Sequence, residues 1–486
     1  MYGAFHLLLT ILLLLVSQGG SRADVVLDWN ALALDCIRND NNGPTTSTRN
    51  LAILHTAIYD AVNSIARTHQ PYQFQIAAPT NCFAEAAVVG AAYEVITALY
   101  PSYAPWADDL YDDFLATATP GTALTNGLNF GWWIGLLTLD SRSADGSNTE
   151  VPYIPSNLPG QWQRTPPFFR PPLTPHWRYV DTFCLPDIEP FVPGPPPSLN
   201  SPEYAAALNE VKAIGKVGST NRTTEQSQIA IFWSDFSFTA MPPGHWHEIA
   251  ATIAISKTNT LEQNARMFAL VSLAQADAAI VCWETKYRYN LWRPITAIQR
   301  ADEDGNPGTE KDVTWNHFLA SPPFPAYTSG HSTFSKASAQ VLTHFYGTDA
   351  VSFMAYSDSL PSVTRSFTSL SACADEVGMS RIYGGIHFQF DNTAGKNCGQ
   401  AIGDYVSANF LLANDKLPFV RLEAISNSVV TIRVQGHVGA PFVVESSSNL
   451  TNWLAFSTNV AAVGGTLVTD SSSANETSKF YRAFER

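Results

Sequence analysis

Charged residues are scarce in this chain, and basic ones are the scarcer kind. Only 14% of the 486 residues are charged, and 28 Lys and Arg stand against 42 Asp and Glu, for a formal net charge of -14. Nucleic-acid binding relies on clustered basic side chains that neutralise phosphates, so we expect no nucleic-acid partner. The apolar fraction of 45% is typical of a packed globular protein. Basic residues that converge on one site in such a chain are therefore informative.

Long apolar runs are also scarce. The run from Leu7 to Val16 is too short to span a bilayer and is followed by Ser21-Arg22-Ala23, which has the small-x-small pattern of a cleavage site. We therefore predict a signal peptide over 1–23 and a secreted or periplasmic protein; an uncleaved membrane anchor is the alternative. No later stretch is expected to be long and apolar enough to cross a membrane, so we expect the mature protein not to be membrane-spanning.

The cysteines lack the C-x-x-C spacing of zinc knuckles and thioredoxin-like motifs. An even number in an exported protein allows up to three disulfides, and the alternative is a set of free, buried thiols. The six are Cys36, Cys82, Cys184, Cys282, Cys373 and Cys398.

Helical periodicity dominates the chain as far as residue 414. Apolar residues recur every three or four positions from Leu51 to Val62, an Ala-rich stretch covers 84–99, and a long helix is expected over 261–289. Between them, 150–200 is so rich in proline that we predict a long loop wrapped over the helices. The predicted fold is mostly α, a helical bundle whose central helices deliver the motifs described below.

The period changes near residues 414–418. Beyond this point apolar residues alternate, as in Val430–Val434 and Phe442–Ser446, with Gly- and Asn-rich turns between them. We therefore predict three parts: the signal peptide, a catalytic domain over 24–414, and a small accessory β-sandwich over 415–486.

A first candidate motif is Lys286-Tyr-Arg-Tyr-Asn-Leu-Trp-Arg293-Pro294. Lys286 and Arg293 are seven residues apart, so both could project from one helix face, with Pro294 ending that helix or starting the next. Taken alone, two basic residues on a helix are more often a solvated face.

A second motif, Ser329-Gly330-His331, lies at the expected start of a helix over 333–342. Helix N-termini offer unpaired N–H groups and a partial positive charge that bind oxyanions, and glycine lets the backbone approach closely. The alternative is a plain capped helix. A serine hydrolase is disfavoured because Phe334 stands where the nucleophile elbow has its second glycine.

A third motif places Arg381 six residues before His387 and Asp391 four residues after it. If the segment is helical, the Asp391 carboxylate can accept a hydrogen bond from one imidazole nitrogen and leave the other basic. The alternative is an ordinary polar pair on a helix. Together the three motifs supply three cations, a glycine turn and two histidines, which is what a bound phosphate or vanadate requires.

The three motifs can be written K-x6-RP, SGH and SR-x5-H-x3-D. In order and spacing they resemble the signature of the vanadium-dependent haloperoxidases and the type-2 phosphatidic acid phosphatase superfamily that shares their site. Thr328 departs from the usual proline before SGH. His55–Asp60, Phe232–Asp235 and Pro242–Trp246 also resemble the secreted haloperoxidase-like branch.

The resemblance implies roles for these residues. Lys286, Arg293 and Arg381 would clamp the equatorial oxygens of vanadate, and Ser329 and the Gly330 N–H would add hydrogen bonds. His387, oriented by Asp391, would be the axial vanadium ligand, or the phosphate-accepting nucleophile in a phosphatase. His331 would be the general acid–base, with Lys286 polarising the bound oxidant. Phe324 matches a position lining the halide side, although it could equally be an ordinary core residue.

The resemblance also implies a function. The leading prediction is a vanadium-dependent haloperoxidase that uses vanadate, hydrogen peroxide and a halide. The alternative is a secreted acid phosphatase that acts on a phosphate ester through a phosphohistidine intermediate, and a remote third is a non-catalytic oxyanion-binding or adhesion protein.

His245 and His247 form a His-x-His that could suggest a separate metal, and Asp235 could pair with a site arginine.

Overall fold

Helices make up most of the protein. The computed structural model describes residues 24–40, 42–414, 418–426, 429–471 and 479–485, so the predicted signal peptide lies outside the described residues. Within these ranges the α-helices are α1 Val25–Asp40, α2 Pro44–Ala66, α3 Ala84–Leu99, α4 Ala104–Thr117, α5 Thr122–Ser141, α6 Pro202–Ile214, α7 Thr224–Phe232, α8 Met241–Lys257, α9 Leu261–Tyr289, α10 Pro294–Gln299, α11 Gly330–Tyr346, α12 Leu370–Tyr383 and α13 Gln389–Asn409.

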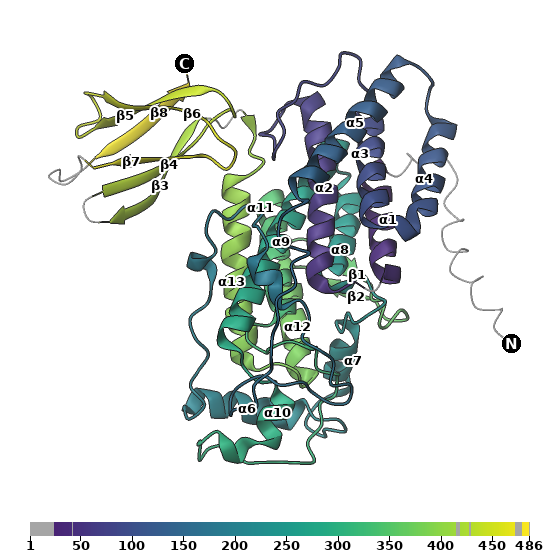
Figure 1. The fold of residues 1–486 in the computed structure, drawn as a ribbon, viewed down its shortest axis with the longest axis vertical. Coiled ribbons are helices and arrows are strands. Elements are labelled where there is room, and N and C mark those ends of the chain that lie inside the picture. Colours follow the sequence, from purple (N-terminus) through teal and green to yellow (C-terminus); the bar gives the residue numbers. More distant parts are fainter. Residues whose placement is uncertain (1–23, 41, 415–417, 427–428, 472–478, 486) are drawn as a thin grey trace.

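The strands are few and most lie at the C-terminal end, which confirms the predicted mostly-α fold with a small C-terminal β region (Figure 1). A two-stranded hairpin, β1-β2, joins α11 to α12. Two three-stranded antiparallel sheets, β3-β4-β7 and β6-β5-β8, follow α13. The strands are β1 Phe353–Ala355, β2 Arg365–Phe367, β3 Phe419–Ser426, β4 Val429–Gln435, β5 Pro441–Ser447, β6 Leu454–Val460, β7 Thr466–Asp470 and β8 Phe480–Glu485.

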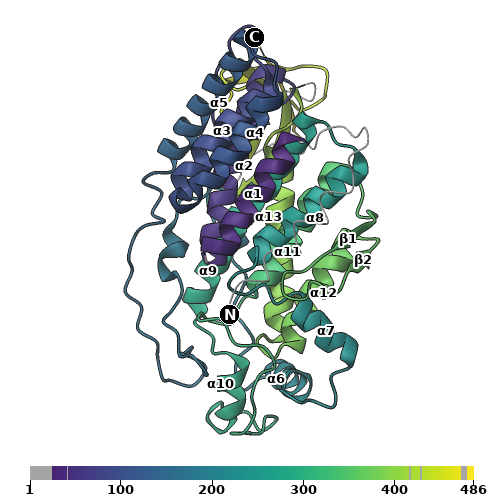
Figure 2. The same ribbon diagram turned by 90° about the vertical axis from the view of Figure 1, so that its right-hand side faces the viewer.

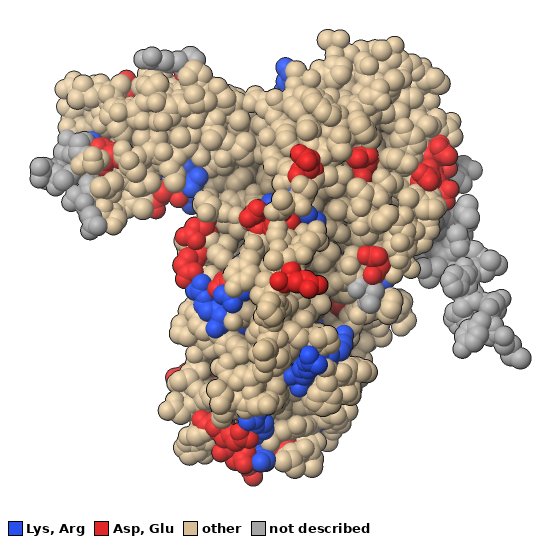
Figure 3. Space-filling view, viewed as in Figure 1, with Lys and Arg blue, Asp and Glu red and all other residues tan. Residues whose placement is uncertain are grey.

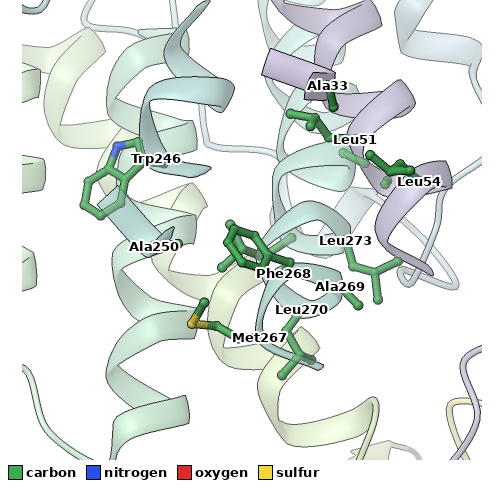
Figure 4. Packing of buried hydrophobic residues seen from close by; sticks show 14 of the residues in the cluster. Ala33, Leu51, Leu54, Trp246, Ala250, Met267, Phe268, Ala269, Leu270 and Leu273 are labelled. Carbon is green, nitrogen blue, oxygen red and sulfur yellow. The ribbon is translucent and has the colours of Figure 1, made fainter. Parts of the chain in front are cut away.

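The long helix α9 is the centre of the core. A capping box between Thr260 and Gln263 starts it, and Asn290 in the left-handed conformation ends it. Its apolar side chains, such as Phe268 and Leu273, pack between α2 and α8 (Figure 4). The helix thus carries Lys286 at its C-terminal end on a rigid, buried support.

By length and composition, α9 is apolar enough to cross a membrane, contrary to our expectation that no stretch after the leader would be. Of its most apolar 18-residue window, 94% is buried inside the protein. The reason is its central position: a helix surrounded by other helices is hydrophobic on every side.

Eight of the remaining helices in the described ranges form two groups around α9; of the others, α8 packs against α2 and α9, α7 against α12, and α6 against α10. Helices α1 to α5 lie together on one side, and α11, α12 and α13 lie on the other (Figure 2). The proline-rich segment 142–201 runs along the body with only two short 3-10 turns, Pro175–Tyr179 and Glu189–Phe191, which confirms the predicted loop. This loop brings Arg170 and Pro171 to the cavity described below.

Two helix pairs approach each other so closely that a side chain would not fit. A Cβ on Gly399 of α13 would lie 2.2 Å from the Thr333 carbonyl oxygen of α11. A Cβ on Gly131 of α5 would lie 2.0 Å from the Ala87 carbonyl oxygen of α3. Glycine is therefore required at both positions by the backbone-to-backbone approach.

All six cysteines are free thiols, so none of the three disulfides that their number allows is formed. Five are buried and Cys82 is half-buried. The fold is therefore held by its core rather than by covalent cross-links.

The two C-terminal sheets pack face to face around a small core that includes Ile432, Phe442 and Val444. This β region touches the helical body near the end of α13. Gln70 Nε2 donates to the Gly436 carbonyl at 2.9 Å, and Gln435 Nε2 donates to the Asn409 carbonyl at 3.1 Å. The predicted boundary at 414 adjoins residues 415–417, which lie outside the described residues, and it stays a prediction.

Acidic and basic side chains are mixed on the face shown in Figure 3. Basic residues occur there in small groups that alternate with acidic ones, not as a continuous basic stripe. This distribution agrees with the composition, in which acidic residues outnumber basic ones.

Candidate oxyanion-binding site

Lys286 and Arg293 meet, although not on one helix face as we expected. Helix α9 ends at Tyr289, and Arg293 is the extended N-cap residue of α10, with φ -81° and ψ 155°. The intervening turn, rather than helical periodicity, brings the two side chains together. Pro294 is the first residue of α10, in keeping with proline's preference for that position.

The Lys286 ammonium group is completely buried. Its Nζ donates to the backbone carbonyls of Pro325 at 3.0 Å and Ala326 at 3.2 Å, and to that of Thr328. These three acceptors tie α9 to the segment that leads into α11. Because an ammonium has three donors, Lys286 would have to exchange one carbonyl for an anion oxygen.

Arg293 and Arg381 are equally buried, and each keeps an unused donor. Arg293 donates to the carbonyls of Phe324 and Ile386, both at 2.8 Å, while its Nη2 has no partner. Arg381 donates from Nη1 to the Trp233 carbonyl at 2.9 Å, and its Nε has no partner. Buried donors without acceptors are rare in proteins, so these two mark a place for an acceptor that the chain does not supply.

Phe324 lies beneath two of these cations. Its ring centroid is 4.8 Å from Lys286 Nζ and 4.9 Å from the guanidinium carbon of Arg293. The negative face of an aromatic ring attracts cations at such distances. Phe324 is therefore more than a core residue: it supports the cation cluster and also lines the cavity.

The start of α11 has the capped geometry that the sequence predicts. The Ser329 Oγ accepts hydrogen bonds from the Ser332 N–H at 3.3 Å and from the Ser332 hydroxyl at 2.8 Å. The single Ser332 hydroxyl proton is also directed at Asn392 Oδ1, an acceptor 2.9 Å away, so the Ser329 hydroxyl would have to turn from Ser332 to donate to an anion. A Cβ on Gly330 would meet Phe334 at 3.4 Å, an ordinary contact, so packing within the protein does not require this glycine. Its predicted role toward a bound anion stays a prediction.

His387 and Asp391 are hydrogen-bonded, but the segment between them is not the helix that we assumed. His387 lies in the link between α12 and α13, and Asp391 is in the first turn of α13. Asp391 Oδ2 accepts from His387 Nδ1 at 2.9 Å and from the Phe388 N–H at 3.0 Å, so the carboxylate also caps the helix. Asp391 can contact His387, four residues earlier, because the carboxylate of a residue in the first helical turn can point back toward the link that precedes the helix.

The second ring nitrogen of His387 faces the cations. Its Nε2 lies 3.0 Å from Arg293 Nη1, which identifies Nε2 as the unprotonated nitrogen when Nδ1 donates to Asp391. Burial, and then the neighbouring Arg293 and Lys286, hold the pKa of His387 well below its ordinary value. The imidazole is therefore neutral and has a lone pair directed at the cluster.

His331 sits opposite, at the first turn of α11, and lines the cavity. Burial, and then Arg381, hold its pKa well below the ordinary value. Its Nε2 has no hydrogen-bond partner and lies 3.9 Å from the Asp235 carboxylate. Asp235 forms no ion pair with a site arginine in the described part of the chain, although its charge raises the pKa of Arg381; it accepts a hydrogen bond from His245.

His245 and His247 do not share a ligand. The His245 ring faces Asp235, whereas the His247 ring faces the core and contacts Asn30 through Nδ1 at 2.9 Å. Two residues apart on α8, they lie on different sides of the helix. In the part of the chain that the structure describes, no group of three His, Cys, Asp or Glu side chains is arranged to hold a metal ion.

A cavity of about 270 Å³ opens onto part of this site, and Lys286, Arg293 and Ser329 are not among the residues that line it. Its polar floor contains Gly330, His331, Arg381 and His387. Its opposite wall is apolar and is formed by Trp283, Phe324 and Phe334 with several prolines, namely Pro44, Pro171, Pro242, Pro322 and Pro323. Sequence motifs missed most of this wall, although Trp283 could have been found three residues before Lys286 on α9.

The charge balance favours an anion. None of Lys286, Arg293 and Arg381 is ion-paired with a carboxylate in the described part of the chain. Burial lowers the pKa of Lys286, and lowers that of Arg293 to about 9 and of Arg381 to about 10, because the charges of Asp391 and Asp235 only partly offset the loss of water. An oxyanion bound among them would supply negative charge and accept hydrogen bonds from the unused donors of Arg293 and Arg381. These residues therefore fit vanadate or phosphate.

Comparisons with known proteins point to one group. Residues 266–413 match the family model described as the VCPO second helical-bundle domain, a range that contains all three motifs. The vanadium chloroperoxidase of Curvularia inaequalis is 27% identical over 407 residues, which cover 66% of this chain. The chain spans about two thirds (65%) of the length of that relative.

Solved structures agree with these matches. A structure described as the first bacterial vanadium-dependent iodoperoxidase superposes with a TM-score of 0.72 and 28% sequence identity, covering 80% of this chain and 97% of its own. The holo form of a bacterial vanadium-dependent chloroperoxidase superposes with a TM-score of 0.62 at 18% identity, covering 76% of this chain and 92% of its own. The second likeness concerns the fold alone.

Proposed function

Because the chain belongs to the superfamily that the vanadium-dependent haloperoxidases share with the type-2 phosphatidic acid phosphatases, we propose that it is a vanadium-dependent haloperoxidase. The observation that carries the proposal is the cluster of three buried, unpaired cations around the Nε2 lone pair of His387. The proposed reaction converts a halide ion, hydrogen peroxide and a proton into hypohalous acid and water.

In this proposal the chain's own residues hold vanadate. Arg293 Nη2, Arg381 Nε and the Ser329 hydroxyl would donate to its oxygens, and the Lys286 ammonium would give up one backbone carbonyl to do the same. His387 Nε2 would bind the metal, with Asp391 fixing the ring through Nδ1. When bound, vanadate supplies a V(V) Lewis acid that activates hydrogen peroxide without changing oxidation state.

His331 is the proposed proton carrier. Because its Nε2 is turned toward Asp235, Nδ1 is the atom that would accept a proton from hydrogen peroxide and return one to the departing oxygen. Its lowered pKa leaves the ring unprotonated at neutral pH and therefore ready to act first as a base.

The apolar wall suits the second substrate. A halide is a weakly hydrated anion, and the Phe324 ring lies between the cavity and two cations. We propose that a halide approaches along this wall, where the cations supply attraction and the aromatic rings exclude water. Trp283, 5.0 Å from Phe324 between ring centroids, extends the same surface.

The alternative reaction uses the same atoms. His387 Nε2 could attack a phosphate ester held by the cation cluster, and His331 could protonate the leaving alcohol. The narrow, largely apolar cavity favours the peroxidase, because a phosphate ester would have to place its leaving group against proline and aromatic side chains.

Parallel assays on purified, vanadate-free protein test the proposal. We expect vanadate addition to produce oxidation of at least one of chloride, bromide and iodide by hydrogen peroxide. Calorimetry should show that phosphate competes with vanadate for one site. Lys286→Met should weaken vanadate binding, whereas Lys396→Met, at a partly exposed lysine paired with Asp375, should not. Hydrolysis of phosphate esters without halide oxidation would favour the phosphatase instead.

We also propose that residues 1–23 direct export, so that the reaction takes place outside the cytoplasm. Mass spectrometry of protein recovered from culture medium or periplasm would show cleavage after Ala23. Recovery of only the uncleaved chain, bound to membranes, would contradict this proposal.

A further inference from the structure

A second histidine lies behind the proposed acid–base residue. Asp235 lies in the connection between α7 and α8, and His245 lies on α8. His245 Nδ1 is 3.0 Å from Asp235 Oδ1, and each side chain is 4% exposed. The other carboxylate oxygen, Oδ2, is 3.9 Å from His331 Nε2. One buried carboxylate therefore faces two imidazoles.

The backbone around Asp235 is strained. Asp235 has φ +45° and Met241, at the start of α8, has φ +59°, both in the left-handed region that non-glycine residues seldom adopt. A residue in this conformation is strained and persists only where its surroundings demand it. The connection thus holds Asp235 in place at an energetic cost, which indicates that the position of its carboxylate matters.

His245 has little else to bind. Its ring packs on Trp233 with centroids 4.5 Å apart, and its Nε2 is buried without a hydrogen-bond partner. The bond to Asp235 is therefore the polar contact that orients this ring. Since Arg381 donates to the Trp233 carbonyl, the same short segment also touches the cation cluster.

The other carboxylates near His245 share a single arginine, Arg38, which also pairs with Asp35. Glu248 on α8 and Asp358 in the loop after β1 are the next carboxylates, and both pair with Arg38 of α1. Burial tends to lower the pKa of His245, but Asp235, and then Glu248 and Asp358, oppose this and leave it raised above the ordinary value. Asp235 and His245 therefore form a mutually dependent pair beneath His331.

We propose that His245 is a positioning residue for His331 and acts through Asp235. Donation from His245 Nδ1 fixes one carboxylate oxygen, so that the other is held facing His331 and keeps its ring oriented toward the cavity. The inference rests on the proposed function insofar as His331 carries protons during turnover. The geometric part, the dependence of His331 on His245, can be measured without turnover.

Two substitutions of His245 separate this role from simple packing. His245→Phe keeps a ring of similar size and loses the donor. His245→Asn loses the ring but places its amide N–H near the former Nδ1. In the vanadate-loaded enzyme we expect His245→Phe to lower kcat by a factor of roughly 10 to 100, a part of the effect of general acid–base catalysis. His245→Asn should restore most of that loss, and calorimetry should find vanadate affinity unchanged in both.

A double-mutant cycle tests the route through Asp235. Asp235→Asn should lower kcat at least as much as His245→Phe and displace the pH–rate profile, because it removes the charge facing His331. Adding His245→Phe to Asp235→Asn should cause no further loss. Losses that multiply, or a His245→Asn variant no better than His245→Phe, would overturn the proposal and leave His245 a packing residue.

A readout without turnover separates failure of this inference from failure of the proposed function. In vanadate-free protein with labelled histidine, the ring signals of His331, assigned with His331→Ala, should change their pH titration in His245→Phe and remain close to wild type in His245→Asn. This result would support the inference even if no halide were oxidised. Unchanged His331 signals in both variants, with normal thermal unfolding, would contradict it even in an active enzyme.

Discussion

Buried arginines occur in two settings in this molecule. Arg142 is paired with the buried Asp145 at 3.0 Å and also binds backbone carbonyls, so its charge is balanced within the fold. Arg293 and Arg381 bind carbonyls but no carboxylate, and each retains a donor without a partner. Burying an unpaired charge is costly, so the second setting is explained by a ligand and the first by stability.

The two histidines at the site should respond differently to substitution. His387→Ala removes the imidazole lone pair that contacts Arg293 in the cation cluster, so we expect vanadate retention to be lost. His331→Ala leaves Lys286, Arg293, Arg381 and His387 in place, so vanadate should stay bound while turnover falls by ~10² to 10⁴. Metal analysis after gel filtration, together with peroxidase assays, measures both effects. Vanadium retained by His387→Ala but lost from His331→Ala would reverse the two roles.

At the residue scale, the sequence predicts which side chains lie together but not the backbone geometry that brings them together. The spacing of four between His387 and Asp391 indicated a contact that exists, although the residues are joined by a cap rather than by a helical turn. Asp235 was considered a partner for an arginine, and the structure places it between two histidines. The difference arises because the conformation of Asp235 is left-handed, and no sequence pattern specifies that for a non-glycine residue.

At the scale of elements, helix packing determines the distances between the residues of the site. Helix α11 carries Ser329, Gly330 and His331 at its start, while α13 carries Asp391 in its first turn. The two helices touch at Gly399, where only glycine fits. Any change in their separation would move the anion-binding N-terminus relative to the proposed metal ligand.

Gly399→Ala should therefore affect both stability and binding. Its Cβ would lie 2.2 Å from the Thr333 carbonyl oxygen, so the helices must separate; we expect a loss of stability of about 1–3 kcal/mol and weaker vanadate binding. Gly131→Ala is the matched control, because it creates the same clash between α3 and α5, away from the site. Urea unfolding and calorimetry compare the two. Equal losses of affinity in both variants would show that the effect is global.

The long helices were the most predictable elements. The stripe from Leu51 to Val62 falls within α2, and the Ala-rich stretch coincides with α3. The short helix α7 and the hairpin β1-β2 were not predicted, and α10 only as one of two interpretations of Pro294, because each depends on contacts with distant segments rather than on local periodicity. The site uses such short elements, so it is less predictable than the bundle that supports it.

At the scale of the whole molecule, the C-terminal β region is attached through a few hydrogen bonds near the end of α13. All site residues precede residue 392. We expect a chain ending at Asn414 to retain vanadate binding and turnover, and to unfold at a slightly lower temperature because the Gln70 contact is lost. Calorimetry, assays and thermal unfolding on the truncated chain test this. A folded but inactive truncated chain would show that the β region contributes to the site.

Acid should destabilise the protein through its buried histidines. His55 Nε2 and His247 Nδ1 both contact the Asn30 side-chain oxygen, and their rings are 5.1 Å apart. Burial lowers the pKa of His247 to about 3 and, together with His247, holds that of His55 well below its ordinary value. Below pH 6.5 the unfolded chain binds these protons and the folded protein does not, so stability is full above pH 6.5 and falls as the pH drops toward 3.

Each such histidine should contribute about 1.4 kcal/mol of lost stability per pH unit below 6.5. We expect His247→Asn, which can keep the bond to Asn30 without titrating, to reduce this slope. Phe268→Leu, at a non-titrating ring that packs against both histidines, should leave it unchanged. Urea unfolding midpoints at pH 5 and pH 7 measure the slopes. Identical slopes in wild type and His247→Asn would locate the acid sensitivity elsewhere.

The burial of the free thiols is relevant to the proposed product, hypohalous acid. Hypohalous acid oxidises sulfur, and an enzyme that releases it is the first protein exposed to it. Only five methionines occur in the chain, and five of the six thiols are buried, which shields them from such an oxidant. Self-inflicted damage should therefore begin at the half-exposed Met354, at Cys82 and at Met241 in the cavity wall. We therefore expect the working lifetime of the proposed enzyme to depend on these few sulfur atoms.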